Sequence, residues 1–186
     1  MRIISGNFKG KKILEPKDVY TRPLKDLTKE SIFNIINHSN KFKVKIEGSV
    51  ILDLFSGVGS FGIECLSRSV DKVYFVENYK NVLPILKKNL SGLKSINNFE
   101  IIEKDIYNED IFKNFNQIFD IIFLDPPYKD KNIEKTLVKI KTSNILKNNG
   151  VLILHRHKKE KENFSDEIKI IEEKIYGISK IIFLTF

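Results

Sequence analysis

The stretch that decides the fold of this 186-residue chain is Val50-Ile51-Leu52-Asp53-Leu54-Phe55-Ser56-Gly57-Val58-Gly59-Ser60-Phe61-Gly62. Its first half is an apolar run, which predicts a short buried strand. Its second half has the spacing G-x-G-x-x-G, which is typical of a tight turn from a strand into a helix. Glu77 ends the next apolar run. Taken alone, this pattern also fits a dinucleotide-binding turn whose acid contacts a ribose hydroxyl.

Strand and helix patterns alternate through the rest of the chain. We expect strands at residues 50–55, 72–76, 99–102, 119–124, 151–154, 168–175 and 181–186. We expect helices at 61–68, 79–93, 106–115 and 132–146, with Gly150 just past the last one as its C-terminal cap. This alternation predicts an α/β fold: a Rossmann-like, mostly parallel seven-stranded sheet with helices on both faces. Ligands of such sheets bind at the carboxyl ends of the strands.

Residues 1–49 have a different pattern and carry most of the positive charge. Two short β-like runs, 2–4 and 12–14, predict a basic hairpin, and residues 25–38 predict an amphipathic helix. The net charge is +8, and this segment holds 11 basic and 5 acidic residues. Such an asymmetry favours contact with a polyanion, most often nucleic acid. A lysine-rich proteome is the alternative, since 28 of the 32 basic residues are lysine. We divide the chain into a basic extension, 1–49, and a main domain, 50–186.

The numbers of cysteine and histidine residues and the hydropathy pattern of the chain exclude several classes of protein. One cysteine, Cys65, excludes a disulfide framework, and with three histidines it makes a metal site unexpected. Cys65 is expected to be a small buried hydrophobe. No apolar run approaches the roughly 18 residues that span a bilayer, and the first residues lack a signal-peptide pattern. We therefore expect a soluble, cytoplasmic protein without membrane contact.

Acidic residues at the strand ends indicate the kind of ligand. Asp53 lies four residues before Gly57, where a pyrophosphate would require bare amides and no carboxylate. A carboxylate there suits S-adenosylmethionine, which has an amine and a sulfonium and no phosphate; a tight turn without a ligand is the alternative. Asp105 ends the third strand. It can accept a hydrogen bond from an adenine amino group, with Ile106 against the ring, or it can cap a helix.

The most specific motif is Asp125-Pro126-Pro127-Tyr128, at the end of the fourth strand. The two prolines fix the backbone. A carboxylate beside a carbonyl can hold both hydrogens of an exocyclic amino group and direct its lone pair at an incoming methyl group. Tyr128 offers a flat face on which an extruded base can stack. The alternative is a proline-rich turn with an exposed tyrosine.

These motifs together resemble the class I S-adenosylmethionine-dependent amino methyltransferases. The N-terminal Arg2-Ile3-Ile4-Ser5-Gly6-Asn7-Phe8-Lys9-Gly10-Lys11-Lys12, with Thr21-Arg22-Pro23 and Glu30-Ser31-Ile32-Phe33-Asn34, narrows the resemblance. It is to the RsmD family, which methylates the exocyclic amino group of one guanine in bacterial small-subunit ribosomal RNA. The resemblance implies a class I methyltransferase fold and S-adenosylmethionine as cofactor. It also implies 16S ribosomal RNA, in a 30S subunit or an assembly intermediate, as the partner of a monomeric enzyme.

The resemblance also implies roles for individual residues. It implies catalytic roles for Asp125, Pro126, Pro127 and Tyr128, cofactor contacts from Asp53, Phe55, Gly57, Gly59, Glu77, Asn78, Asp105, Ile106 and Arg22, and RNA contacts from Arg2, Lys9, Lys11, Lys12 and Arg22. Pro23 and residues 28–30 would close over cofactor and substrate with Arg22. The chain departs from the family pattern at Ser5, Lys9, Lys11, Lys29 and His155. The lysines keep the charge of arginine but lose its bidentate geometry, and His155 replaces an acid at the end of the fifth strand.

Three other functions remain open from the sequence. A DNA adenine or cytosine amino methyltransferase shares the Asp-Pro-Pro-Tyr motif but usually carries a separate recognition domain. A nicotinamide-dependent oxidoreductase fits the glycines and Glu77, but leaves Asp53 and the proline motif unexplained. A non-catalytic RNA-binding protein fits the charge but not the strand-end acids.

Overall fold

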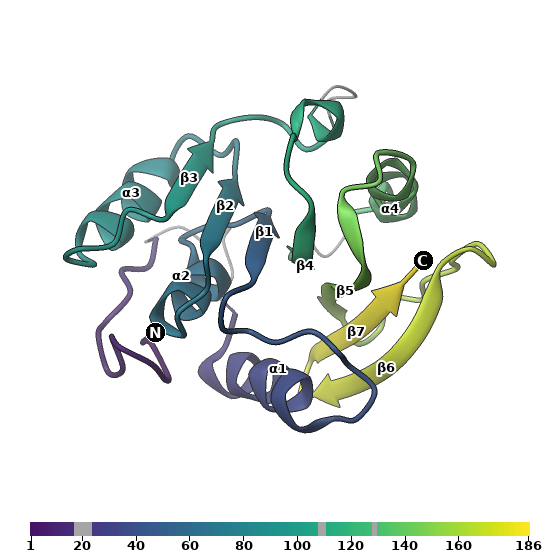
Figure 1. Cartoon of the computed structure of the whole chain (residues 1–186), viewed down its shortest axis with the longest axis horizontal. Helices are drawn as coiled ribbons and strands as arrows, with labels where there is room; N and C mark the ends of the chain where they lie inside the picture. Colours follow the sequence, from purple (N-terminus) through teal and green to yellow (C-terminus); the bar gives the residue numbers. More distant parts are fainter. Residues whose placement is uncertain (17–23, 108–110, 128–129) are drawn as a thin grey trace.

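The computed structural model describes residues 1–16, 24–107, 111–127 and 130–186 (Figure 1). The elements in chain order are α1 (Asp26–His38), β1 (Val50–Leu54), α2 (Ser60–Ser67), β2 (Lys72–Val76), α3 (Leu83–Ser91), β3 (Phe99–Ile102), the 3₁₀ turn η1 (Phe112–Asn114), β4 (Phe119–Leu124), α4 (Ile133–Thr142), β5 (Leu146–His157), β6 (Lys169–Tyr176) and β7 (Ser179–Thr185).

The seven strands form one sheet in the order β3-β2-β1-β4-β5-β7-β6. The pairs from β3 to β5 are parallel, and β7 runs antiparallel to both β5 and β6. Leu54 of β1 is in register with Val76 of β2 and Leu124 of β4, so these strands end at the same edge of the sheet. The chain extends the sheet in one direction from β1 and in the other from β4, which makes the β1–β4 boundary the topological switch point. The expected mostly parallel, Rossmann-like sheet is confirmed.

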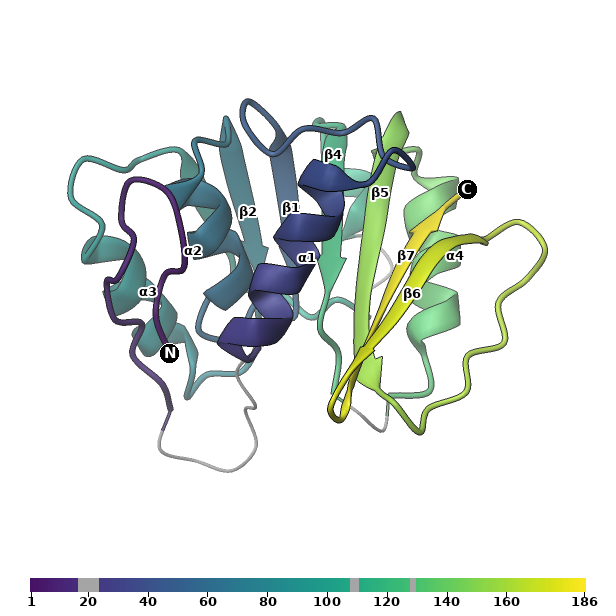
Figure 2. The ribbon, with the colours of Figure 1, turned by 90° about the horizontal axis from the view of Figure 1, so that it is seen from below.

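Helices cover both faces of this sheet (Figure 2). Successive residues of a strand point to opposite faces: Ile51 belongs to one buried cluster and Leu52 to the other. The first cluster includes the apolar faces of α1, α2 and α3, and the second includes those of α4 and η1. Cys65 is fully buried in the first cluster, as expected.

The N-terminal segment packs into the first of these clusters. Ile3 and Ile13 are buried there beside α1 and α2. The expected hairpin is present as a single antiparallel bridge between Arg2 and Lys12. Its turn lies so close to the end of α2 that a Cβ added to Gly6 would come within 1.8 Å of the Ser67 carbonyl oxygen. Only glycine fits at this contact.

A buried ion cluster ties this segment to α1 and α2. The Glu64 carboxylate accepts hydrogen bonds from the amides of Ile4 (2.7 Å) and Ser5 (2.9 Å) and from the Arg68 guanidinium. Lys29 lies 3.7 Å from Glu64 and donates to the Arg2 carbonyl at 2.7 Å. Burial lowers the pKa of Lys29, and the charge of Glu64 partly offsets this.

This cluster changes the interpretation of residues 28–30. We expected them to close over cofactor and substrate, but Lys29 is fully buried and paired with Glu64, and Thr28 is also buried. In the described structure the pocket is lined from this region by Leu24.

Three element boundaries differ from expectation. The helix expected from Tyr79 begins at Leu83, because the Glu77 carboxylate binds the first amides after β2 and delays the helix. In place of a helix over 106–115 the described residues form η1 alone, with 108–110 outside the description.

The third difference concerns the end of α4. This helix ends at Thr142, followed by Asn144 in the left-handed region (φ 50°). Asparagine tolerates that conformation and so takes the role expected of Gly150. Gly150 lies inside β5, which begins at Leu146 and is longer than the expected 151–154. Among the helices described, none is long and apolar enough to cross a membrane.

Candidate active site

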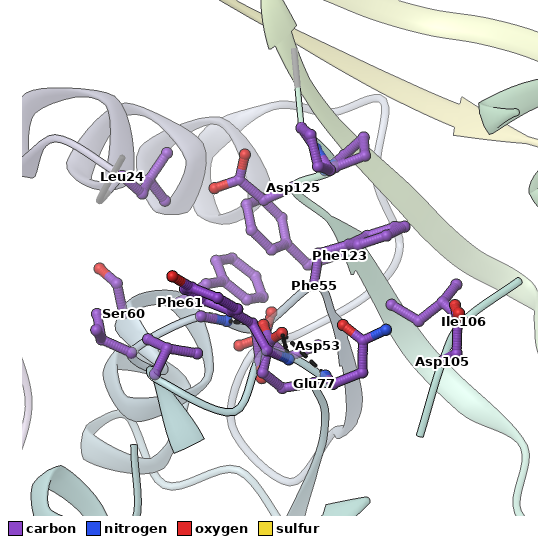
Figure 3. A pocket seen from close by; sticks show the side chains of 18 of the residues that line it. Leu24, Asp53, Phe55, Ser60, Phe61, Glu77, Asp105, Ile106, Phe123 and Asp125 are labelled. Carbon is purple, nitrogen blue, oxygen red and sulfur yellow. Dashed lines mark hydrogen bonds between the residues drawn. The ribbon is translucent and has the colours of Figure 1, made fainter. Parts of the chain in front are cut away.

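A pocket of about 860 Å³ opens at the carboxyl ends of the parallel strands (Figure 3). Its volume lies within the range of ligand-binding pockets. Its acidic lining residues come from four strand ends: Asp53, Glu77, Asp105 and Asp125. No lysine or arginine is among the lining residues described. The aromatic lining consists of Phe55, Phe61, Tyr79, Tyr107 and Phe123.

Asp53 lies at the floor of the pocket and is 1% exposed. Its Oδ2 accepts the amide of Gly62 at 2.9 Å, so the carboxylate lies against the start of α2. A Cβ on Gly62 would come within 2.3 Å of the Phe75 ring, which explains the glycine. Burial raises the pKa of Asp53 well above its ordinary value; the Gly62 bond partly offsets this, and the charges of Asp125 and Glu77 add to it. A cation bound in the pocket would lower the pKa of Asp53 again, because it would stabilise the charged carboxylate.

The glycine loop turns sharply beneath the pocket. Phe55, Gly57 and Gly59 all have left-handed backbone conformations, with φ of 56°, 54° and 85°. For Phe55 this conformation is strained, and such strain is often found at ligand sites. Gly59 does not line the pocket; it shapes the turn, where a Cβ would press on Leu86. Ser56 lines the pocket, and its buried hydroxyl has no hydrogen-bond partner among the described residues.

Glu77 joins the loop to the end of β2. Its Oε2 accepts the amide of Gly57 at 2.7 Å, and its Oε1 accepts the amides of Asn78 and Tyr79. Oε1 is thereby filled, whereas Oε2 retains one lone pair for a hydroxyl of a ligand. Asn78 is exposed at the rim.

Asp105 and Ile106 form the far side of the pocket. Asp105 Oδ1 accepts the amide of Tyr107, two residues further on, at 2.9 Å, which forms a local Asx turn. Ile106 is buried, and the Tyr107 ring contacts the ring of Phe55 with 5.8 Å between centroids. An acceptor, an aliphatic side chain and two rings here suit a flat heterocycle.

The Asp125 motif forms the side of the pocket nearest α1. Figure 3 shows the Asp125 carboxylate pointing toward Leu24, above the aromatic rings. The Asp125 amide donates to the Leu54 carbonyl at 3.3 Å, so β1 fixes the start of the motif. The Phe61 ring stacks on Phe123 at 4.1 Å and supports it from below.

The proline carbonyls are not equivalent. The Pro127 carbonyl already accepts the amide of Asp130 (2.9 Å) and the guanidinium of Arg156 (3.2 Å). Both prolines line the pocket, and because the Pro127 carbonyl is already bonded, the Pro126 carbonyl is the better candidate for a substrate contact. Tyr128, Arg22 and Pro23 lie outside the described residues.

Apart from Arg22, which lies outside the described residues, the RNA-contact candidates lie on the N-terminal hairpin, away from the pocket lining. Arg2, Lys9 and Lys12 are exposed, and Lys11 donates to the Gly92 carbonyl beyond α3. Asn89 of α3 exchanges hydrogen bonds with the backbone of Leu14. The hairpin and α3 therefore form one continuous surface.

Sequence reasoning missed several pocket residues. Phe61 and Phe123 have the apolar spacing of core residues, and nothing in the sequence marks them as lining. Leu24 reaches the pocket only through the docking of α1. Ser56 carried a signal, since it directly follows a strand and precedes the first glycine of the turn.

The strand order and the acid-lined pocket at the switch point define a class: the Rossmann-like class I S-adenosylmethionine-dependent methyltransferases. The pocket fits that cofactor, because its carboxylates, with no lysine or arginine among the described lining residues, favour a positively charged ligand, and the Ser56 and Glu77 oxygens can bond hydroxyls. The chain belongs to the RsmD family of methyltransferases. The family profile described as "Conserved hypothetical protein 95" matches residues 1–185.

Relatives agree with this assignment. The "Ribosomal RNA small subunit methyltransferase D" of Haemophilus influenzae is 35% identical over 96% of this chain and 90% of its own. The protein of that name from Buchnera aphidicola subsp. Baizongia pistaciae is 35% identical over 84% of this chain and 76% of its own. The crystal structure of "putative methylase HI0767" from H. influenzae has a TM-score of 0.74 and 33% identity, and the match covers 98% of this chain and 96% of that one.

Proposed function

We propose that this enzyme methylates the exocyclic N2 amino group of one guanine in 16S ribosomal RNA. The observation that carries the proposal is the meeting of Asp53 and Asp125 in one pocket, beside the Pro126-Pro127 turn. The Asp53 carboxylate suits a cationic methyl donor, and the Asp125 carboxylate suits an amine that accepts the methyl group. The names of the relatives support ribosomal RNA as the substrate.

In this proposal the strand-end residues of β1, β2 and β3 hold the cofactor. S-adenosylmethionine supplies an already activated methyl group. Asp53 and the Gly57 loop hold its amino-acid part, Glu77 binds its ribose hydroxyls, and Asp105 with Ile106 binds its adenine. The buried Ser56 hydroxyl, which has no hydrogen-bond partner among the described residues, can form a hydrogen bond with a polar group of the cofactor.

The Asp125 motif holds the acceptor. The guanine amino group donates one hydrogen to Asp125 and the other to the Pro126 carbonyl, so its lone pair faces the donor. The new N–CH3 bond would form as the S–CH3 bond breaks, and the electron pair of the broken bond would stay on sulfur. The nitrogen would release one proton to Asp125 or to water. The protein's contribution is positioning and exclusion of water. Tyr128 provides the stacking face for the base.

A basic surface formed by the hairpin and α3 docks the RNA. Residues 1–14 and 79–98 contain eight basic residues and no acidic one. Lys88 and Lys94 of the second segment are exposed, as are Lys9 and Lys12 of the first. Asn89, which joins the two segments, also donates to the carbonyl of Val58, a pocket residue. The surface is thus anchored to the wall of the pocket.

Methyl transfer to ribosomal subunits tests the proposal. The purified chain is incubated with labelled S-adenosylmethionine and 30S subunits from a strain that lacks its own RsmD-family enzyme, and the modified base is mapped. We expect one labelled guanine, carrying the methyl group on N2. Naked 16S RNA and duplex DNA are assayed in parallel. Transfer to DNA alone would support a DNA amino methyltransferase, and binding of NAD but not S-adenosylmethionine in calorimetry would refute the methyltransferase assignment.

A further inference from the structure

A buried histidine lies directly behind the proposed acceptor-binding carboxylate. β4 and β5 pair in register up to Leu124 and Leu154, so Asp125, just past the end of β4, lies beside His155, which is still within β5 and pairs with β7. His155 Nδ1 lies 2.8 Å from Asp125 Oδ1. The Asp125 side chain is 20% exposed and faces the pocket, whereas the His155 side chain is 4% exposed.

The charges around the imidazole favour its protonated form. Burial and the Arg156 charge lower the pKa of His155, but the charge and hydrogen bond of Asp125 raise it more, so that the net shift is upward. On β7 the residue in register is the uncharged Ile181. Lys180 beside it donates to the Glu160 carbonyl. A carboxylate only accepts hydrogen bonds, so at 2.8 Å the imidazole donates its Nδ1–H to Asp125 Oδ1.

The acidic groups of α1 do not compete for this imidazole. Asp26 lies near Arg2 and Lys29, and Glu30 is exposed. Arg156, on the same strand, holds the other end of the motif, where its guanidinium bonds the Pro127 and Asp130 carbonyls. The carboxylate and the turn that follows it are thus both held from β5.

We propose that His155 is a positioning residue for methyl transfer: its Nδ1–H holds Oδ1 of Asp125 and leaves Oδ2 directed at the amino group of the acceptor. This inference rests on the proposed role of Asp125. An unheld carboxylate rotates about its side-chain torsion and lets the amine turn away from the donor. Misplacements of this kind cost up to about 100-fold in rate. His155 retains its own proton throughout, and the proton released by the amine goes to Oδ2 or to solvent.

Three variants test the role by kinetics. His155→Leu removes the donor, His155→Asn keeps an N–H donor at the position of Nδ1, and His157→Leu is the matched control on the same strand. We expect His155→Leu to lower the single-turnover rate on 30S subunits about 10- to 100-fold, with an unchanged dissociation constant for S-adenosylmethionine. We expect His155→Asn to restore most of the rate. Equal losses in both His155 variants, or no loss in His155→Leu, would overturn the inference.

A second measurement does not depend on the folding of His155→Leu. The imidazole of His155 is titrated by NMR in the wild-type chain and in Asp125→Asn. We expect its pKa to fall in the variant, because the attraction of the carboxylate is lost and burial remains. An unchanged titration would overturn the pairing. Wild-type protein that methylates no guanine would instead contradict the proposed function, and the NMR comparison would still decide whether His155 and Asp125 are coupled.

Discussion

The Asp53 carboxylate accepts the amide of Gly62 at 2.9 Å and has burial as the largest influence on its pKa. The bond satisfies one oxygen, but the charge has no cation beside it among the described lining residues. The buried charge of Asp53 therefore lowers the stability of the ligand-free protein, and a cationic ligand would offset this loss.

This relationship predicts opposite effects of Asp53→Asn on binding and on stability. Losing a hydrogen bond to a charged group costs about 1.5–3 kcal/mol, so we expect S-adenosylmethionine to bind about 10- to 150-fold more weakly in calorimetry. The free protein should melt at a higher temperature at neutral pH, because the asparagine can still accept the Gly62 amide without a buried charge. Unchanged affinity would contradict the assignment of Asp53 to the cofactor.

The raised pKa of Asp53 also predicts the pH dependence of folding. A carboxyl whose folded pKa exceeds its unfolded value stabilises the protein fully at low pH, and this contribution is lost as the pH rises through the folded pKa. As the pH rises from the unfolded pKa of Asp53 through its folded pKa, we expect the free energy of unfolding of the ligand-free wild type to fall relative to that of Asp53→Asn. Denaturant titrations of both proteins at several pH values measure the difference, and parallel curves would contradict it.

Asp125→Ala should separate chemistry from cofactor binding. We expect methyl transfer at saturating cofactor to fall about 100-fold or more, with little loss of S-adenosylmethionine affinity. Tyr128→Ala should weaken substrate capture, and Tyr128→Phe should retain most activity because the ring is retained. Single-turnover rates on 30S subunits provide the measurement. A near-normal rate for Asp125→Ala would place the methyl acceptor elsewhere.

The hairpin offers a matched pair of glycine variants. Gly6 and Gly10 both have left-handed backbones, with φ of 80° and 86°, but only Gly6 touches the end of α2. We expect Gly10→Ala to cost about 1–2 kcal/mol from backbone strain, and Gly6→Ala to cost more because it displaces the hairpin. Thermal melting and RNA affinity should both rank Gly6→Ala as the more damaged variant. Equal effects would show that the contact with Ser67 adds nothing.

Salt dependence of binding tests the basic surface. Replacing Lys88 and Lys94 by alanine should weaken RNA binding and flatten its dependence on salt by roughly 0.7–0.9 units of log–log slope per lost phosphate contact. The triple replacement of Lys9, Lys11 and Lys12 should act in the same direction. Cofactor affinity should be unaffected in either variant.

The control for this experiment is Lys135→Ala with Lys169→Ala. These exposed lysines lie on α4 and β6, outside the proposed RNA surface. If the control loses as much RNA affinity as the double variant at Lys88 and Lys94, binding depends on net charge alone and not on the surface formed by the hairpin and residues 79–98.

The sheet and the acidic residues of the pocket could be predicted because their signals are local. Each strand is a short apolar run, and each acid lies near the carboxyl end of one, either within it or at most three residues after it. The role of Lys29 could not be predicted, because its partner Glu64 lies on another helix and only packing brings them together. The end of α4 was missed because Asn144, and not the later Gly150, adopts the left-handed conformation. The coupling of His155 to Asp125 depends on strand register, which no local pattern encodes.

The four pocket acids come from four different strand ends, and this links ligand supply to the lifetime of the protein. The cofactor as proposed touches the acids of β3, β2 and β1, so it binds only when these strands are correctly paired. It therefore stabilises the assembled sheet by mass action and has no such effect on a partly unfolded chain. Resistance to proteolysis should rise with cofactor concentration, so a cell depleted of methyl donor would retain less of this enzyme as well as slowing its reaction.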